Sequence, residues 1–409
     1  MKILVIYQYL LEQNQGMGGS RYNQFARFWS KQGHQVTILA GMVHYASGQK
    51  NPKYKNTFIV KEKFDDNVTV IRCFVSAGYN KSFLGRFWAY INFSFSATIA
   101  GLFFTGKQDL IIASSPPLFA AIPGYLISRL KRIPLIFELR DLWPKFAIDL
   151  GILKNKLLIK MSCWLENFIY RKAKLINVLT PAFKKYLAEE KNISINKIIY
   201  VPNGADLDIF FPNNEGAKIR KKHGWQDKFI VLYVGAHGIA NDLWQILDVA
   251  KEVKENKNIV FVLIGDGMEK NKLKESAKKD SLLNVEFLEP MVKKDLVNYV
   301  NAADVCTAIL HPTFTTTYPN KVFDYMSCAK PIILPIAGAI KEVAIDEAKA
   351  GLFVEPKNTE MFKSAILDFY HHREKARKMG ENGYSYVKKN FDRANLAKRY
   401  LEKIDRLFK

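Results

Sequence analysis

Apolar and polar positions along this chain follow two alternating patterns. Short apolar runs rich in Val, Ile and Leu are followed by longer amphipathic stretches, and the order repeats almost to the C-terminus. Such short runs are typical of buried strands and the longer stretches of helices, so the pattern predicts βαβ units with parallel sheets. The predicted strands are residues 2–7, 35–41, 68–74, 109–114, 134–139, 174–180 and 197–202, then 229–235, 258–265, 285–289, 305–310, 331–336 and 351–356.

Helices are predicted between these strands. In residues 19–33, Tyr22, Phe25, Phe28 and Trp29 recur at helical spacing. The second half has predicted helices at 242–256, 269–279, 293–301 and 321–328, and a basic amphipathic helix ends the chain.

The length of the chain, 409 residues, exceeds the size at which one hydrophobic core usually stops growing. We therefore predict an α/β protein with two Rossmann-like domains that face one another across a central cleft. The turn-rich stretch VPNGADLDIFFP separates the two series of elements. The expected domains are residues 1–205 and 206–385, followed by a C-terminal helix, 386–409, that packs back toward the first domain.

Charge is distributed unevenly between the two halves. The chain has 61 Lys and Arg against 39 Asp and Glu, a net charge of +22. Residues 1–205 carry 28 basic and 11 acidic side chains (+17), whereas residues 206–409 carry 33 and 28 (+5). A basic surface attracts phosphates, whether they belong to nucleic acid, anionic lipid or a pyrophosphate substrate, and charge alone does not choose among them.

The cysteines and the N-terminus favour a cytosolic location. Four separated cysteines, without a C-x-x-C motif or a nearby histidine, indicate reduced thiols rather than disulfides or a zinc site. The sequence MKILVIYQYL enters a strand pattern directly, so we expect no secretory signal peptide.

One uncharged segment, residues 87–106, is long enough to span a bilayer. Its Asn, Ser and Thr residues make it only moderately apolar, and a strand pattern follows at once. We expect a buried helix or one at the membrane surface rather than a transmembrane helix.

Three glycine-containing turns follow predicted strands. The first has Gly18 and Gly19 just before a helix, where backbone N–H groups and the helix N-terminus suit a phosphate, although the dinucleotide-binding spacing is absent. The other two place His237 beside Gly235, as a candidate ligand contact, and Asp266 beside Gly265, as a candidate contact to a base or ribose. The plainer interpretations are a capping turn for the glycines and for Asp266, and a structural role for His237.

The stretch ELRDLWP places Glu138, Arg140 and Asp141 at the end of a strongly apolar strand. Ionisable groups there must be paired with one another or with a ligand. We predict ligand contacts, and the alternative is a structural bridge between arginine and carboxylate.

The stretch PTFTTTYPNKVFDYMSCAKPII joins a hydroxyl-rich loop to a helix that begins near Lys321. A lysine in the first turn opposes the helix dipole, a conflict that a bound anion would resolve. We predict that Lys321 neutralises a pyrophosphate and that Asp324 accepts hydrogen bonds from ribose hydroxyls. Thr316, Tyr318 and Asn320 are predicted substrate contacts; the alternative is a solvated lysine with a capping aspartate.

The chain resembles the retaining glycosyltransferases of family 4 with the GT-B fold, within them the bacterial O-antigen and capsule enzymes similar to fucosamine transferases. The resemblance is carried, in this order, by YNQFARFWSKQGHQVTILAG, IIASSPPLF, FELRDLWP, VPNGADLDIF, VLIGDG and PNKVFDYMSCAKPII. It implies a nucleotide-sugar donor, usually a UDP-sugar, bound mainly by the second domain, with the acceptor held by the first.

The resemblance also implies roles for individual residues. Asp324 takes the place of the acidic residue that contacts the donor ribose, but Thr316 stands where many members have a further Glu. The Arg and Lys that often hold the diphosphate are missing from VGAHGIANDLWQ, which leaves Lys321 as the catalytic cation. Arg140 replaces a frequent His, so Asp141 is the expected catalytic residue toward the acceptor.

The expected partners are a UDP-sugar, a polyprenyl-pyrophosphate-linked glycan acceptor and an anionic membrane surface, contacted through the basic N-terminal half. No cofactor, essential metal or nucleic acid is expected, although residues 206–208 read D-L-D. The expected location is cytoplasmic and peripheral, on the inner face of a bacterial plasma membrane. The alternatives are a non-hydrolysing sugar-nucleotide epimerase and, from charge alone, a protein that binds nucleic acid or an anionic surface.

Overall fold

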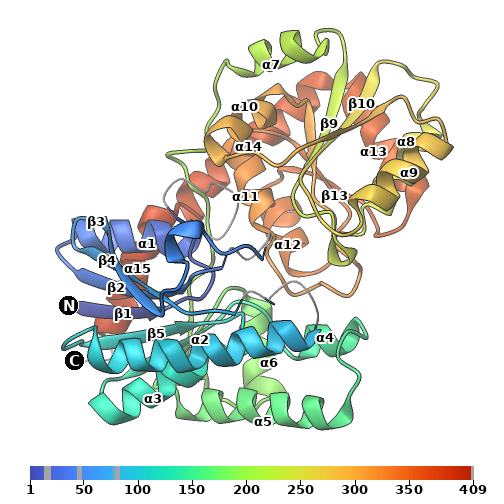
Figure 1. Ribbon diagram of the computed structural model, residues 1–409. Coiled ribbons are helices and arrows are strands. Elements are labelled where there is room, and N and C mark those ends of the chain that lie inside the picture. The colour runs from blue at the N-terminus through green and yellow to red at the C-terminus, as the bar shows by residue number, and fades with distance from the viewer. Residues whose placement is uncertain (13–19, 44–47, 77, 79–82, 407–409) are drawn as a thin grey trace. The chain divides into compact units, whose positions relative to one another are not determined.

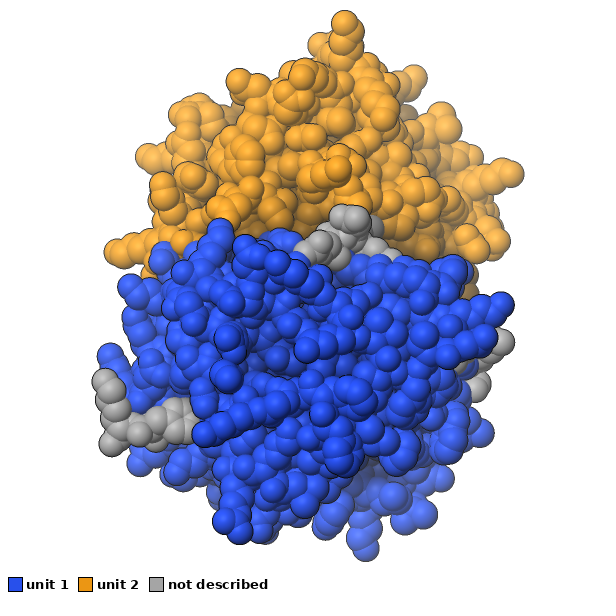
Figure 2. All heavy atoms as spheres, turned by 60° about the vertical axis from the view of Figure 1, so that its left-hand side comes forward, with its two compact units in different colours: residues 1–202, 394–409 blue, residues 203–393 orange. Residues whose placement is uncertain are grey.

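The computed structural model describes residues 1–12, 20–43, 48–76, 78 and 83–406 (Figure 1). The chain divides into two compact units, coloured separately in Figure 2. Unit 1 comprises residues 1–202 and 394–409, and unit 2 comprises residues 203–393. The sequence-based division was at 205 and 385, so the observed return to unit 1 lies eight residues later.

Unit 1 is built on an eight-stranded sheet with the order β3-β4-β2-β1-β5-β6-β7-β8. Its strands are β1 Lys2–Ile6, β2 Gln35–Gly41, β3 Ile59–Asp65, β4 Val68–Cys73, β5 Leu110–Ser114, β6 Leu135–Leu139, β7 Leu175–Val178 and β8 Ile198–Tyr200. All pairs are parallel except β3 with β4. The seven strands predicted in the first half are present. Strand β3, IVKEKFD, was not predicted, because this edge strand is rich in charge.

Helices cover both faces of this sheet. They are α1 Ser20–Lys31, α2 Phe83–Phe103, α3 Ala121–Lys131, α4 Lys145–Asp149, α5 Lys156–Lys172, α6 Pro181–Glu189 and α15 Arg393–Asp405, with short turns η1 Pro52–Tyr54, η2 Leu118–Ala120 and η3 Ile195–Lys197. Helices α1 and α15 share one core cluster, in which the Trp29 indole donates to the carbonyl of Ala397 at 2.9 Å. The last helix is thus part of unit 1.

The other face of the sheet is covered by α2, α3 and α5, which form one layer in Figure 1. Helix α2 contains most of the uncharged segment 87–106. Ala89, Phe93, Ala97 and Ala100 are fully buried. Among the described residues, no helix is long and apolar enough to cross a membrane.

Unit 2 contains a six-stranded parallel sheet with the order β11-β10-β9-β12-β13-β14. The strands are β9 Phe229–Val234, β10 Ile259–Ile264, β11 Val285–Leu288, β12 Val305–Thr307, β13 Ile332–Leu334 and β14 Gly351–Phe353. The helices are α7 Gly216–His223, α8 Trp244–Glu252, α9 Lys270–Lys279, α10 Lys293–Ala302, α11 Asn320–Ser327, α12 Ala339–Lys341, α13 Thr359–His371 and α14 Arg373–Asn390, with η4 Ile239–Asn241 and η5 Glu342–Glu347. Each strand and helix predicted for this half is present, with slightly different bounds.

A buried ion pair joins the elements of unit 1 at the carboxyl end of β6. Glu138 and Arg21 are almost completely buried, with Arg21 Nη2 3.0 Å from Glu138 Oε2. Ser114 and Asn177 also donate to this carboxylate, while the guanidinium donates to the carbonyls of Val201 and Pro202. The pair therefore connects helix α1 to strands β5, β6 and β7 and to the end of β8.

We expect Glu138→Gln to lower the free energy of unfolding by about 3–5 kcal/mol, because the guanidinium of Arg21 would remain buried without its counter-charge. Urea denaturation followed by circular dichroism measures this loss. Lys185→Ala is the matched control, because Lys185 and Glu189 form an exposed pair at 4.0 Å, and its effect should stay below about 0.5 kcal/mol. Equal stability of the Glu138→Gln variant and the wild type would contradict the structural role of the pair.

Candidate active site

Two loops of unit 2 are packed tightly together at the carboxyl ends of β9 and β10. Gly235 and Gly265 have positive φ angles, +147° and +152°. A Cβ on Gly265 would lie 1.8 Å from the carbonyl oxygen of Gly235, so only glycine permits this approach. Gly235 and Gly265 thus lie in the post-strand turns where the sequence placed them, and Gly265 serves loop packing directly.

Lys321 lies directly against the first of these loops. Its Nζ donates to the Tyr233 hydroxyl at 2.7 Å and lies 4.0 Å from the centre of that ring. A Cβ on Gly235 would lie 2.7 Å from the same Nζ. Burial lowers the pKa of the Lys321 ammonium to about 7. An anion bound here would therefore restore the full positive charge of the lysine.

His237 is fully buried beside Lys321 and Lys270. Burial, together with the charges of the two lysines, lowers its pKa to about 4, so the imidazole is neutral at pH 7. Among the described residues, neither ring nitrogen has a hydrogen-bond partner. A neutral imidazole offers one donor and one acceptor, so His237 can bind a polar ligand group.

Lys270 and Asp266 complete the second loop. Lys270 is almost fully buried and pairs with Glu289 at 2.8 Å. Asp266 is exposed, and its carboxylate accepts from the N–H of Gly267 at 2.8 Å. The sequence did not single out Lys270, because a lysine in an amphipathic helix usually faces solvent. Nor did it single out Tyr233.

Asp324 does not pair with Lys321, although both lie on α11. Its charged neighbours are Lys293, Asp206 and Arg393. Asp206 forms ion pairs with both of these cations, at 2.9 Å from Lys293 and 2.5 Å from Arg393. Burial raises the pKa of Asp324 to about 6. Asp206 thus has a structural role at the start of the D-L-D stretch.

The hydroxyl-rich loop before α11 is fixed by its backbone, because the N–H of Ala339 donates to the Thr315 carbonyl at 2.8 Å. Tyr318, expected to contact substrate, is buried against Phe323 and Phe391 with ring centres 5.9 and 6.3 Å away. The structure therefore gives Tyr318 a packing role. Thr316 is half-buried and Asn320 is exposed.

In unit 1 the predicted trio at the end of β6 separates into different roles. Glu138 is engaged by Arg21, not by Arg140 as the structural alternative supposed, and it offers no free carboxylate to a ligand. Arg140 lies over the ring of Tyr7, 5.1 Å from its centre.

Asp141 differs from Glu138 because none of the described residues donates a hydrogen bond to its half-buried carboxylate. Burial raises the pKa of Asp141 to about 6, against the opposing effect of Arg140. It is the carboxylate of this trio with capacity for a ligand. Gly18 and Gly19 lie outside the described residues.

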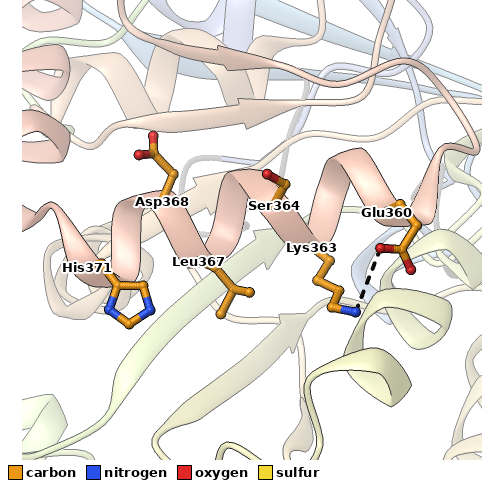
Figure 3. Close-up of a pocket in the computed structure, with 6 residues that line it drawn as sticks. All are labelled: Glu360, Lys363, Ser364, Leu367, Asp368 and His371. Carbon is orange, nitrogen blue, oxygen red and sulfur yellow. Dashed lines mark ion pairs between the residues drawn. The ribbon is translucent and has the colours of Figure 1, made fainter.

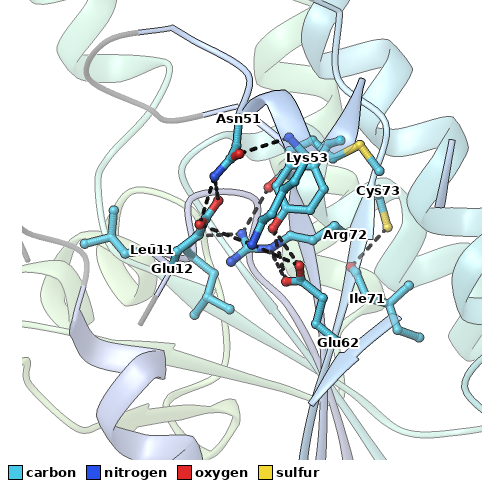
Figure 4. Close-up of polar contacts among 12 residues, drawn as sticks. Leu11, Glu12, Asn51, Lys53, Glu62, Ile71, Arg72 and Cys73 are labelled. Carbon is cyan, nitrogen blue, oxygen red and sulfur yellow. Dashed lines mark hydrogen bonds and ion pairs between the residues drawn. The ribbon is translucent and has the colours of Figure 1, made fainter. Parts of the chain in front are cut away.

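A polar network supports the carboxyl ends of β1 and β2 (Figure 4). Arg72 donates to the carbonyls of Leu10 and Gly41 at 2.8 and 3.1 Å. Glu62 accepts from Arg72 and the Tyr54 hydroxyl and pairs with Lys53 at 3.1 Å. These contacts hold Leu10, eight residues before Gly18, and the sequence pattern gave no sign of them.

A shallow groove on α13 is a poorer candidate. Its lining side chains all come from this one helix and are spread along its length (Figure 3). Lys363 pairs with Glu360 of the same helix at 3.7 Å. In the described part of the chain, no group of acidic, histidine and cysteine side chains could hold a metal ion.

Comparison with known proteins matches both halves of the chain to glycosyltransferase domains. Residues 18–204 match the "Glycosyl transferase 4-like domain", and residues 216–386 match "Glycosyl transferases group 1".

The curated relatives include two proteins of Escherichia coli. The "Putative colanic acid biosynthesis glycosyl transferase WcaI" of Escherichia coli (strain K12) is 21% identical over 99% of this chain and 100% of that protein. The "UDP-Gal:alpha-D-GlcNAc-diphosphoundecaprenol alpha-1,3-galactosyltransferase" of Escherichia coli is 26% identical over 64% of this chain and 66% of that protein, slightly less than two thirds of its length.

Solved structures share the architecture. Sucrose-phosphate synthase from Thermosynechococcus elongatus has a TM-score of 0.79 at 18% identity and covers 100% of this chain and 99% of that one. Anabaena Alr3699/HepE, crystallised with UDP and glucose, has a TM-score of 0.71 at 17% identity and covers 99% of each chain. The predicted GT-B fold, with two parallel-sheet domains, is confirmed.

We expect UDP affinity to fall by up to about tenfold for each pH unit between pH 7 and pH 9. Lys321 has a pKa of about 7 in the free protein, so above that pH a bound diphosphate must draw a proton onto it. UDP itself is already about nine-tenths ionised at pH 7 and changes little above it, because the second pKa of a phosphate group is about 6. Isothermal titration calorimetry at several pH values measures the slope.

Lys321→Met should weaken UDP binding at pH 7 by about 10- to 100-fold, the value of a charged hydrogen bond, and should remove the pH dependence. Asp324→Asn is the companion variant: its affinity should fall while the slope above pH 7 persists, because Asp324, with a pKa of about 6, is already ionised there. Unchanged affinity and slope in the Lys321→Met protein would refute the assignment.

Proposed function

We propose that this chain, whose two halves match a glycosyl transferase 4-like domain and a glycosyl transferases group 1 domain, is a glycosyltransferase that transfers a sugar from a UDP-sugar to a polyprenyl-pyrophosphate-linked glycan. The observation that carries the donor half is the half-buried Lys321, held against the loop of Gly235 beside the unpartnered His237. A diphosphate is the ligand that such a cationic, partly desolvated loop suits.

Relatives support the choice of donor and acceptor. The galactosyltransferase is named for UDP-Gal and a diphosphoundecaprenol-linked acceptor, and WcaI, similar over its whole length, is named for colanic acid biosynthesis. HepE was crystallised with UDP. We therefore propose a role in the synthesis of a bacterial surface polysaccharide of the O-antigen or capsule type.

Donor cleavage develops negative charge on the diphosphate oxygen that leaves the sugar. Lys321 is the second residue of α11, so its ammonium and the N–H groups at that helix end stabilise the charge together. Asp324 is proposed to bind the ribose hydroxyls. The proposed reaction retains the configuration of the sugar and forms no covalent intermediate with the protein.

Asp141 is proposed to orient the acceptor hydroxyl. The bond from the sugar carbon to the diphosphate oxygen breaks, the bond to the acceptor oxygen forms, and the acceptor proton leaves with UDP or moves to Asp141. A carboxylate with a pKa of about 6 is mostly ionised at neutral pH and can accept this proton. We propose that no metal ion takes part.

Calorimetric titration with UDP, GDP and ADP in the presence of EDTA tests the donor half. We expect saturable binding of UDP alone. Transfer of radiolabelled sugars from UDP to lipid-linked glycans extracted from membranes tests the reaction, again with EDTA. If no nucleotide binds, the proposed donor site fails, whereas binding that requires a divalent metal would reject only metal independence.

Asp141→Asn should bind UDP like the wild type but transfer sugar about 100-fold more slowly, as expected for loss of a proton-accepting group. Asp149→Asn is the matched control, because Asp149 is exposed and pairs with Lys145 on the same segment. Equal transfer rates in the Asp141→Asn and wild-type proteins would exclude the acceptor role.

We further propose that unit 1 docks on the anionic inner face of the plasma membrane. Leu84 and Trp88 on α2, and Leu157, Met161 and Trp164 on α5, are each more than half exposed. These two helices carry five basic residues, Arg86, Lys156, Lys160, Arg171 and Lys172, whereas their one acidic residue, Glu166, is buried and paired with Lys191 at 2.6 Å. Exposed aromatic groups beside cations suit an anionic bilayer surface.

Trp88→Asp combined with Trp164→Asp should lower partitioning onto phosphatidylglycerol vesicles at least about tenfold, because two large apolar groups no longer leave water. Co-sedimentation measures the bound fraction. Leu283→Asp, at a site in unit 2 that is 96% exposed, is the control and should partition like the wild type. Wild-type protein that stays in the supernatant would count against this location.

A further inference from the structure

An apolar pocket in unit 1 lies beside the loop that carries Asp141. Its wall is formed by side chains of α2, η2, α5 and the segments after β6, namely Phe87, Tyr90, Phe119, Trp143, Leu153 and Leu158. Arg86 and Ser162 also line it. The hollow is a cavity of about 60 Å³ that is partly open to solvent.

The wall of this pocket is preorganised by aromatic contacts. The ring of Phe119 lies between those of Phe87 and Tyr90, with centres 5.4 and 5.7 Å away. The Tyr90 hydroxyl in turn accepts a hydrogen bond from Tyr9 at 3.3 Å. Rings fixed in this way keep an apolar surface available to a ligand without collapse of the wall.

The position of the pocket connects two surfaces already described. Trp143, in its wall, lies two residues after Asp141, whose carboxylate has capacity for an acceptor hydroxyl. Phe87 and Leu158 are the immediate chain neighbours of Trp88 and Leu157, which belong to the exposed apolar positions of α2 and α5. The exposed cation Arg86 lines the same hollow.

We infer that this pocket binds the first part of the prenyl chain of a lipid-linked acceptor, with Arg86 beside the pyrophosphate. An acceptor of this kind has a sugar, a doubly charged linker and a hydrocarbon chain in that order. Asp141, Arg86 and the apolar pocket offer one matching group for each part. The inference rests on the proposed function, because it concerns the acceptor named there.

Farnesyl pyrophosphate is the probe, used below its micelle concentration and followed by calorimetry. Inorganic pyrophosphate reports on the charged group alone, and farnesol reports on the chain alone. We expect the wild type to bind farnesyl pyrophosphate at least about tenfold more tightly than either. Binding no tighter than that of inorganic pyrophosphate would overturn the pocket, because the charged group alone would then explain it.

Ser162→Trp fills the pocket from α5. It should lower the affinity for farnesyl pyrophosphate to that for inorganic pyrophosphate. Ser364→Trp is the matched control: it adds the same bulk on the exposed face of α13 (Figure 3) and should leave affinity unchanged. If Ser162→Trp does not fold, Leu158→Asp, at a half-buried position of α5, replaces bulk with charge. Equal affinity in a folded pocket variant and the wild type would overturn the inference.

UDP titration of the same preparations separates this inference from the proposed function. A wild type that binds UDP but not farnesyl pyrophosphate overturns the pocket and leaves the donor site standing. A wild type that binds farnesyl pyrophosphate, with loss in Ser162→Trp, supports the pocket even if UDP fails to bind.

Discussion

Compensation of buried charge is the constraint on which both units depend. In unit 1 the guanidinium of Arg21 neutralises Glu138, and in unit 2 that of Arg393 neutralises Asp206. Each arginine thus satisfies one carboxylate and also donates to backbone carbonyls of the chain around residues 201–204. A carboxylate buried without such a partner would be neutralised by protonation instead.

In each unit a second carboxylate lies near the arginine–carboxylate pair but has no arginine paired with it. Asp141 and Asp324 are both half-buried, and burial raises the pKa of each to about 6. Carboxylates held in this state are typical of sites where a ligand supplies the missing hydrogen bonds. In each unit the ion pair and the candidate functional carboxylate are therefore explained by the same need of a buried carboxylate for a counter-charge. The carboxylate that pairs with the arginine has a structural role, and the other keeps capacity for a ligand.

Lys321 is the cationic counterpart of these carboxylates. Because Gly235 has no side chain, the Lys321 ammonium can lie against the loop, where burial lowers the pKa of the lysine to about 7. Its contacts, the Tyr233 hydroxyl and ring, carry no negative charge. A lysine paired with a carboxylate would have less capacity left for a diphosphate, so its separation from Asp324 favours anion binding.

The sequence by itself determined the strands and helices of both units, because hydrophobic periodicity is local and each buried strand or amphipathic helix shows it within a few residues. It missed β3, whose charges suit an exposed edge and hide the strand pattern. It placed the ends of β6 and β9 and the start of α11 to within one residue, and with them the segments that hold Asp141, His237 and Lys321.

Only the tertiary structure decided which of these polar residues are paired. Arg21 and Glu138 are 117 residues apart, and Asp206 and Arg393 are 187 apart, so no local pattern could identify them as partners. Tyr318 and Phe391 are likewise far apart in the sequence, so their packing could not be predicted. Lys270 is buried by contacts that the sequence of its own helix does not predict. Charge pairing and burial depend on long-range packing, whereas secondary structure depends mainly on neighbours along the chain.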